Sequence, residues 1–383
     1  MSAPLRILRN AIPIVSDTIT SRGRGLKNFF AKGGVGRVVV LESDDWGSQR
    51  VPSADAREKL KQLGILSDKS AYDRETLENA QDLEVLCGSL LRFKGSDGRA
   101  AIMTCFVNPA NPDFAKIKEA NFVSYFYEPT RAEHERRGDF QSVSKAWAAG
   151  LENSLLSREY HGREHLQVRS WLKALQANDE RCRRAFNHSY YSVELPDVKK
   201  VAKGFRAAYL FSDFEEIQEL EEVLVSGAKL FEEETGAGAR VFCPPNNVFH
   251  PQLYPAVRAA GCDYILRHTH NLEPDGTGDA KDVWGQKGVR EAGLIGYGRN
   301  ALFEPEQGFG VDHTMRQVRC AFAWGVPAII STHRVNYVGG IDPGVRERGA
   351  VALQELLRRI TTNWPDVRFM SSSQLMQELA GLD

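Results

Sequence analysis

Two adjacent carboxylates at the end of an apolar run are the first residues in this sequence whose types could do chemistry. The run 38–41 is short and apolar, which is typical of a strand buried on both faces, and after Glu42 and Ser43 it reaches Asp44 and Asp45. Because neighbouring side chains of a strand point to opposite faces, the two carboxylates cannot both be ordinary surface charges. A buried carboxylate must be paired, hydrogen-bonded or bound to a metal ion. The alternative is that an aspartate caps the turn after the strand.

A pair of histidines, His161 and His165, has the spacing that metal binding needs. Residues four apart share one side of a helical turn, where both imidazoles could reach a single ion at about 2.0–2.1 Å. The order His-Gly-Arg-Glu-His excludes the HExxH pattern of zinc proteases, because the glutamate is not at the second position. The spacing therefore favours a metal site of another kind.

Two other apolar runs end in residues whose side chains could take part in catalysis or binding. The run 325–330 predicts a buried strand that delivers His333 and Arg334 at its carboxyl end. The strand 240–242 leads into Cys243-Pro244-Pro245-Asn246-Asn247, where two prolines predict a rigid loop. In parallel sheets, sites are assembled at the carboxyl ends of strands. The alternative for a lone histidine in such a place is a structural hydrogen-bonding role.

The elements that position these residues alternate along the chain. Apolar periodicity and capping residues predict helices at 54–63, 76–93, 213–235, 253–260, 349–360 and 373–379. Between them, apolar runs predict strands at 100–107, 240–242, 262–266 and 367–370. This alternation predicts an α/β fold with a parallel sheet.

Composition narrows the class of protein. The chain has 383 residues, of which 42% are hydrophobic and 26% charged, and its net charge is −1. It can bury a large core, and nothing in its charge indicates a nucleic-acid partner. The six cysteines are scattered without a CxxC motif, which favours reduced thiols over a disulfide framework.

The first 36 residues read as a basic arm in front of a single catalytic domain at 37–383. The apolar stretch of the arm is interrupted by Pro13, so it lacks the apolar core of a signal peptide. No later stretch approaches the roughly 20 apolar residues of a membrane span. We therefore expect a cytoplasmic protein without a transmembrane segment, and an arm that is solvated or contacts another copy in a homo-oligomer. Contact with an anionic membrane surface is the alternative.

Residues 108–156 break the alternation and predict an insertion in the domain. This segment contains prolines, charges and several aromatic residues, and the aromatic ones either pack the insertion onto the domain or form a platform for a sugar ring. They are Phe122, Tyr125, Phe126, Tyr127 and Trp147.

Taken in order, these motifs resemble the polysaccharide deacetylase superfamily, also called the NodB-homology or carbohydrate esterase family 4 group. The shared features are Ser-Asp-Asp near the start, HxxxH, a Pro-Pro loop after a long amphipathic helix, and Ile-Ile-Ser-Thr-His near the end. The match runs from about residue 37 to 379. The resemblance implies a distorted (β/α)7 barrel that binds one divalent metal ion, usually Zn²⁺.

The resemblance also implies a role for each motif. Asp45, His161 and His165 would hold the metal ion, and Asp44 would be the general base. This division is chemically reasonable, because three ligands leave a position open at which a metal lowers the pKa of water. A second carboxylate beside it can then accept the proton.

Two further roles follow from the same resemblance. His333 would be the general acid that protonates the leaving amine, which suits a group with an ordinary pKa near 6.5. The backbone N–H of Asn246, after the Pro-Pro pair, would stabilise the oxyanion.

This sequence departs from the family pattern in several places. Trp46 stands where the family has glycine, so we expect it to wall the pocket, and Pro245 is expected to contact the substrate. Gly162 follows the first histidine, where the family has serine or threonine. Most important, Cys243 replaces the arginine that steadies the base carboxylate. Either another cation takes this place or the pKa of Asp44 is set differently. Arg267 and Arg334 are the candidate cations, each at or just beyond the end of a predicted strand, and both are also expected to contact the substrate.

The function that we expect is removal of an N-acyl group, such as acetyl, from a substrate that contains an amino sugar. The absence of a signal peptide favours a cytoplasmic glycan precursor. One alternative is a related metal-dependent hydrolase of a non-sugar amide, since the same centre requires only a carbonyl group. The others are a carbohydrate-binding protein that has lost turnover together with the arginine, and a purely structural role.

Overall fold

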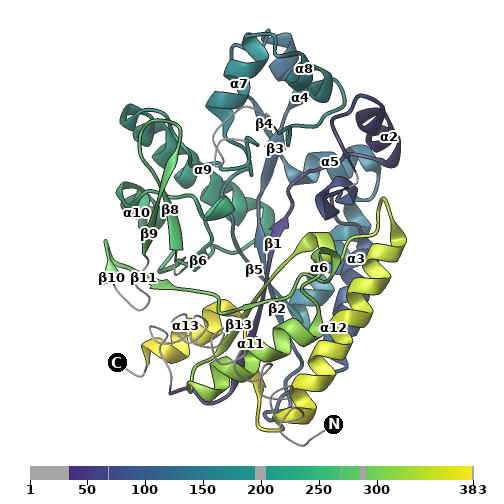
Figure 1. The fold of residues 1–383 in the computed structure, drawn as a ribbon, viewed down its shortest axis with the longest axis vertical. Helices are drawn as coiled ribbons and strands as arrows, with labels where there is room; N and C mark the ends of the chain where they lie inside the picture. The colour runs from purple at the N-terminus through teal and green to yellow at the C-terminus, as the bar shows by residue number, and fades with distance from the viewer. Residues whose placement is uncertain (1–33, 68, 195–203, 269, 285–289, 382–383) are drawn as a thin grey trace, which may run out of the picture.

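A computed structural model describes residues 34–67, 69–194, 204–268, 270–284 and 290–381 (Figure 1). The predicted basic arm therefore lies almost entirely outside the described residues. Within the described ranges, no helix has the length and apolar character that crossing a membrane requires.

In the described part of the chain, a mostly parallel sheet of ten strands forms the centre of the molecule. Its middle strand, β1 (Val38–Trp46), is buried along its whole length and pairs in parallel with β2 (Met103–Val107) and β13 (Ala328–His333). The order is β10-β11-β7-β6-β5-β2-β1-β13-β12, and β14 pairs with the start of β1. The other strands of this sheet are β5 (Leu156–Tyr160), β6 (Val241–Phe242), β7 (Tyr264–Leu266), β10 (Arg290–Glu291), β11 (Leu294–Tyr297), β12 (Ala301–Leu302) and β14 (Arg368–Phe369).

The sheet curls but does not close. Among the described residues, β10 and β12 are the two ends of the sheet and do not pair with each other. The result is a curled half-barrel, so the expected α/β class and distorted barrel are confirmed. Two small hairpins lie outside it, formed by β3 (Ala110–Pro112) with β4 (Tyr127–Pro129) and by β8 (His270–Pro274) with β9 (Ala280–Trp284).

Helices cover the sheet, and their ends follow local signals. Asn79 and Ser371 form capping boxes at the starts of α3 and α13, and Gly236 ends α9 with a left-handed φ of +78°. The α-helices are α2 (Ala54–Gln62), α3 (Ala80–Leu91), α4 (Phe114–Glu119), α5 (Thr130–Arg137), α6 (Phe140–Glu152), α7 (Val168–Gln176), α8 (Glu180–Phe186), α9 (Ile217–Thr235), α10 (Tyr254–Ala259), α11 (Val311–Ala323), α12 (Pro343–Asn363) and α13 (Ser372–Ala380).

The hydrophobic core of the described residues includes a main part around β1 and a separate part to which α4, α7 and α8 contribute, helices that lie together at the top of Figure 1. The predicted insertion 108–156 is divided between the two. Its helix α6 packs on α3 in the main core, whereas α4 belongs to the second. The buried side chains of Phe122 and Trp147 are thus packing residues, while Phe126 and Tyr127 are exposed.

One close contact holds the segment that follows β13. A Cβ atom added at Gly349 of α12 would lie 1.7 Å from the carbonyl oxygen of Asn336, so a larger residue has no room there. Asn336 ends the short 3-10 helix η6 (Arg334–Asn336), directly after the strand that carries His333. The packing of α12 therefore fixes the backbone at the end of β13.

Candidate active site

An irregularity at the end of β1 brings both aspartates to one cavity. Asp45 has a left-handed φ of +74°, and the pairing of β1 with β2 shifts register between Ser43 and Trp46. A bulge of this kind redirects side chains that would otherwise alternate between the two faces. As a result Asp44 and Asp45 both line a cavity of about 300 Å³. The left-handed backbone at a non-glycine residue is strained, which is common at functional positions.

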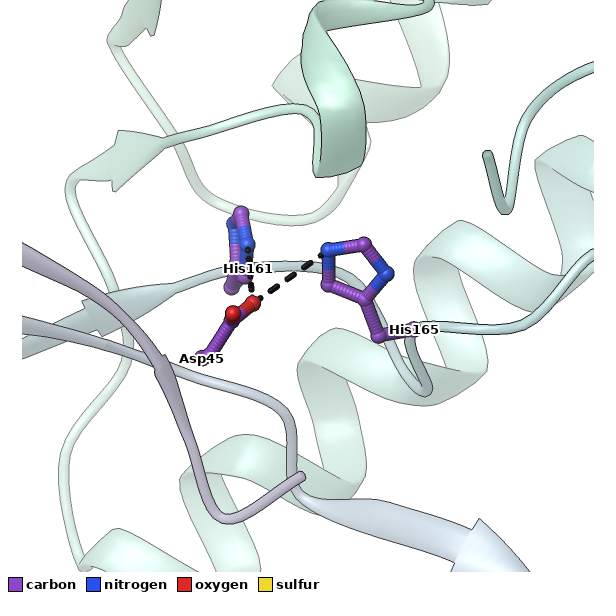
Figure 2. Close-up of side chains that lie close together, drawn as sticks. All are labelled: Asp45, His161 and His165. Atoms are coloured by element: carbon purple, nitrogen blue, oxygen red, sulfur yellow. Dashed lines mark ion pairs between the residues drawn. The ribbon is translucent and has the colours of Figure 1, made fainter. Parts of the chain in front are cut away.

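Asp45, His161 and His165 converge in this cavity, as Figure 2 shows. Asp45 Oδ1 lies 3.6 Å from His161 Nε2 and 3.3 Å from His165 Nε2. All three side chains are buried, and their ligand atoms lie within 4.8 Å of one another. The arrangement brings one oxygen and two nitrogen donors around a common point.

The prediction that the two histidines share a helical turn is wrong. They lie in the loop between β5 and α7, where Gly162 has a left-handed φ of +83°. The side-chain amide of Asn108 holds the loop by donating to the carbonyl oxygens of His161 and Gly162, at 2.6 and 3.0 Å. A Cβ atom at Gly162 would lie 3.0 Å from Tyr209 Oη. The serine or threonine of the family pattern therefore does not suit this loop.

The protonation of the histidines fits a metal ion. His161 Nδ1 lies 2.8 Å from the carbonyl oxygen of Cys243. Because a carbonyl only accepts hydrogen bonds, Nδ1 of His161 carries a proton, and Nε2 is the nitrogen that faces Asp45. Burial lowers the pKa of His165 well below its usual value, so the imidazole of His165 is neutral. Arg50 Nη2 donates to the other oxygen of Asp45 at 2.9 Å and fixes the carboxylate.

Asp44 is held by an arginine that the sequence analysis did not identify. Arg299 donates two parallel hydrogen bonds to Asp44, from Nη1 at 2.6 Å and Nη2 at 2.5 Å. Its Nε donates to Glu42 at 2.6 Å. Burial alone would raise the pKa of Asp44, but the charge and hydrogen bonds of Arg299 outweigh this effect and lower it to about 2. Asp44 is therefore ionised throughout the neutral range.

The expectation that Arg267 or Arg334 supplies this cation is wrong, and neither side chain lines the cavity. Arg334 is fully buried and is bound by Glu75, Glu78 and the carbonyl oxygen of Ser48. It joins the end of β13 to the segments after β1, so it cannot contact a substrate as predicted.

Arg267 lies elsewhere because two glutamates hold it. Its guanidinium is 3.0 Å from Glu291 and 3.7 Å from Glu273. Arg299 follows the short strand β11 by two residues, so it also lies beyond the carboxyl end of a strand. This position would make it a further candidate, but a strand of four residues leaves no periodic pattern in the sequence.

His333 has its own carboxylate partner, Glu304, which the sequence analysis also missed. His333 Nδ1 lies 2.6 Å from Glu304 Oε1, and Nε2 lies 3.8 Å from Asp44 Oδ2. Asn336 donates to the second oxygen of Glu304 at 2.7 Å. Burial alone would lower the pKa of His333, but the charge of Glu304 outweighs it and raises the pKa to about 9. His333 therefore carries a proton at neutral pH.

Replacing Glu304 with Gln is expected to lower the pKa of His333 by about 1–3 units, because an opposing charge is lost while burial remains. If His333 acts as an acid, activity disappears as the pH rises through its pKa. The upper limb of the pH profile of kcat/KM should then move to lower pH in Glu304→Gln. Glu355→Gln, in an exposed pair on α12, should leave it in place. An unchanged upper limb in Glu304→Gln would contradict the role of the pair.

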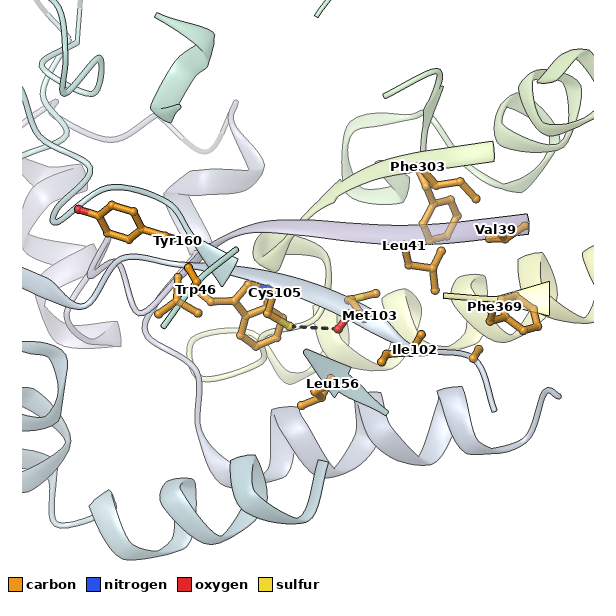
Figure 3. Packing of buried hydrophobic residues seen from close by; sticks show 14 of the residues in the cluster. Val39, Leu41, Trp46, Ile102, Met103, Cys105, Leu156, Tyr160, Phe303 and Phe369 are labelled. Carbon is orange, nitrogen blue, oxygen red and sulfur yellow. Dashed lines mark hydrogen bonds between the residues drawn. The ribbon is translucent and has the colours of Figure 1, made fainter. Parts of the chain in front are cut away.

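Two other predicted contacts of the substrate are wrong. Trp46 is fully buried and packs edge-on against Trp147 at 5.5 Å, on the core side of β1 shown in Figure 3. The bulge directs Asp45 into the cavity and Trp46 away from it. Pro245 is also buried and does not line the cavity, whereas its neighbours Pro244 and Asn246 do. Asn246 has a left-handed φ of +54°.

Comparisons with family models and with curated proteins give no match. Solved structures do match. A 4-α-glucanotransferase from Thermococcus litoralis has 11% identity and a TM-score of 0.45, with 89% of this chain covered. This chain spans 40% of that protein.

Two other matches carry deacetylase names. One is a candidate polysaccharide deacetylase from Mycobacterium smegmatis, with 12% identity, a TM-score of 0.41 and 90% of both chains covered. The other is a variant of the peptidoglycan deacetylase PdaC from Bacillus subtilis, with 9% identity, a TM-score of 0.37, and 91% of this chain and 93% of that chain covered. Structures with deacetylase names are thus among those that this chain resembles, as the motifs led us to expect.

Proposed function

We propose that this chain is a metal-dependent hydrolase that removes an N-acyl group, such as acetyl, from an amino sugar. The observation that carries the proposal is the cavity itself. It holds one oxygen and two nitrogen donors that converge, a second carboxylate with a separate cation, and a histidine paired with a glutamate. Asp44 is ionised and His333 is protonated at neutral pH, as a proton acceptor and a proton donor must be.

Asp44 is the proton acceptor in this proposal. The two hydrogen bonds from Arg299 fix its orientation and keep it ionised, so it can take the proton of the attacking water. Asp45 cannot share this role, because one of its oxygens binds Arg50 and the other faces the two histidines. The adjacent aspartates therefore divide into a base and a ligand.

His333 is the proton donor. It lines the same cavity as the histidine pair, Glu304 retains its proton at neutral pH, and it can protonate the amine nitrogen that leaves. The N–H of Asn246, on the rigid loop that lines the same cavity, is the proposed donor to the carbonyl oxygen of the substrate.

Asp45, His161 and His165 are the proposed ligands of one divalent ion. Two imidazole nitrogens and a carboxylate oxygen suit Zn²⁺, which accepts three protein ligands and leaves one position open. A bound zinc ion would polarise the acyl carbonyl group and lower the pKa of water.

The alternative of a carbohydrate-binding protein without turnover is no longer favoured, because it depended on the absence of an arginine beside Asp44. Arg299 supplies that cation from a different strand end. Hydrolysis of a non-sugar amide would use the same groups, so only an experiment can distinguish it from hydrolysis of an N-acylated amino sugar.

The deciding measurement is acetate release from N-acetylglucosamine and its oligomers, compared with acetate release from simple N-acetyl amines. Release should cease after chelation and return with zinc. No release from any of these substrates by the zinc-loaded chain would refute the proposal.

Replacing either histidine of the proposed zinc site with Ala is expected to release the metal. Each variant loses one of three ligands, so the purified protein should change from about one zinc ion per chain to much less. Elemental analysis after gentle purification measures this directly. His250→Ala, a histidine outside the cavity lining, is the matched control and should retain the ion. A wild type that binds no divalent ion on titration would contradict the site.

A further inference from the structure

Among the residues that the structure describes, three arginines line the cavity: Arg50, Arg206 and Arg299. Two of them are neutralised by close carboxylates, since Arg50 lies 2.9 Å from Asp45 and Arg299 lies 2.5 Å from Asp44. Both of these guanidiniums are almost completely buried. Their charge is therefore used within the protein.

Arg206 differs from the other two. Within the described part of the chain, the carboxylate closest to it is that of Glu194, at 3.9 Å, and the Glu194 side chain is 57% exposed. A pair at this distance with an exposed partner is weak. In addition, Arg206 Nε is buried and has no hydrogen-bond partner among the described residues. A buried guanidinium N–H that lacks a partner is costly unless a ligand completes it.

The surroundings of Arg206 place it beside the proposed zinc ligands. It lines the same cavity as His161 and His165. Its guanidinium lies 5.7 Å from the ring of Tyr72, which Arg50 also approaches at 5.5 Å. Tyr72 in turn lies edge-on to His333 at 6.1 Å. A molecule in the cavity could thus meet Arg206 while its acyl group lies between the histidine pair and His333.

We propose that the substrate carries an anionic group, a phosphate or a carboxylate, that binds Arg206. This inference rests on the proposed hydrolase function and specifies its substrate class as an acidic N-acylated amino sugar. Guanidinium is the side chain best suited to such groups, because its fixed fork of N–H donors matches their oxygens. The weak pair with Glu194 can open at little cost. Neutral N-acylated amino sugars lack an anionic group that could accept hydrogen bonds from Arg206.

Steady-state kinetics of the zinc-loaded full chain test this inference. The probes are N-acetylglucosamine, a phosphorylated N-acetylglucosamine, and N-acetylmuramic acid, which carries a carboxylate. We expect at least one acidic sugar to have a KM about tenfold or more below that of the neutral sugar, the scale of one charged hydrogen bond. Comparison of the two acidic sugars identifies the anion.

The variants separate binding from catalysis. Arg206→Gln should remove the preference by raising KM for the acidic sugar, with kcat nearly unchanged, and Arg206→Lys should restore part of it. Arg358→Gln, in an exposed pair on the surface of α12, should behave as wild type. A wild type without preference for either acidic sugar, or a preference that persists in Arg206→Gln, would overturn the inference.

A binding measurement makes this outcome independent of turnover. Calorimetric titration of the full chain, stripped of metal, with inorganic phosphate should give binding that Arg206→Gln loses and Arg358→Gln keeps. If phosphate binds in this way but no acetate is ever released, the hydrolase proposal fails and the anion site stands. If acetate is released without dependence on Arg206 and phosphate does not bind, only the anion site fails.

Discussion

Asp44→Asn is expected to lower kcat/KM by about 10²–10⁴-fold while the protein keeps its metal ion. The range is that of a general base removed from a positioned site. Asparagine has nearly the same shape as aspartate but cannot accept a proton, and Asp44 lies outside the group of converging ligand atoms. Steady-state kinetics together with elemental analysis of the same preparation measure both effects.

Asp45→Asn is the matched control, because it changes the same functional group one residue further along. It should lose metal affinity, since the ligand charge is lost and Arg50 is left without its close partner. Circular dichroism should show that both variants are folded. Equal loss of metal in the two variants would show that the assignment of base and ligand is wrong.

The difference between what the sequence predicted and what it missed has a physical basis. Buried strands such as β1 are apolar runs, so their position and the polar residues at their ends are visible in one dimension. The (β/α) alternation and the positions of Asp44, Asp45 and His333 after buried strands were predictable in this way. Arg299 and Glu304 follow strands of only four and two residues, which leave no periodic signal.

Orientation was harder to predict than position. Strand alternation would direct Asp44 and Asp45 to opposite faces, and helical spacing explained His161 and His165 as one turn. In the structure, left-handed backbone at Asp45 and at Gly162 produces both arrangements. Such single-residue conformations depend on tertiary contacts, here the Asn108 amide that holds the histidine loop, and no local pattern reports them.

The third kind of error concerned which arginine pairs with which carboxylate. Arg334 and Arg299 are both arginines just beyond strand ends, and sequence position alone cannot tell which one faces Asp44. Glu75 and Glu78, far from Arg334 in the sequence, take its charge. The pairing is decided by which carboxylates surround each buried guanidinium, because neither charge can be buried alone.

Arg299→Gln is expected to impair the site in two ways. The pKa of Asp44 should rise by about 1–3 units or more, because burial then acts without the opposing cation. Activity requires ionised Asp44 and disappears as the pH falls through its pKa. The acidic limb of kcat/KM, which lies near pH 2 for a pKa of about 2, should therefore move up into a range where the protein can be assayed.

The second effect is on stability. Arg299 also binds Glu42, whose side chain is fully buried and accepts from Tyr297 and Ser372. Loss of the cation leaves two buried carboxylates, Glu42 and Asp44, without their charged partner. A change of this kind typically costs about 3–5 kcal/mol of unfolding free energy. Chemical denaturation of Arg299→Gln and Arg299→Lys measures it, and lysine should recover part of the loss because it keeps the charge but not the paired hydrogen bonds.

Two control variants test whether Arg299 is the residue that sets the acidic limb of kcat/KM. Arg267→Gln should leave the limb unchanged, because Arg267 pairs with Glu273 and Glu291 outside the cavity lining. Cys243→Ala should also have little effect on the limb. The sulfur of Cys243 lies 3.9 Å from both Asp44 and Arg299. Burial raises the pKa of this thiol well above its usual value, so the thiol stays neutral. If Arg299→Gln left the limb in place while Cys243→Ala abolished activity with the metal retained, the thiol would have a chemical role of its own. The assignment of Arg299 as the cation that lowers the pKa of Asp44 would then be wrong. Cys243, which stands where the family has arginine, would have to take part in the proton transfer itself.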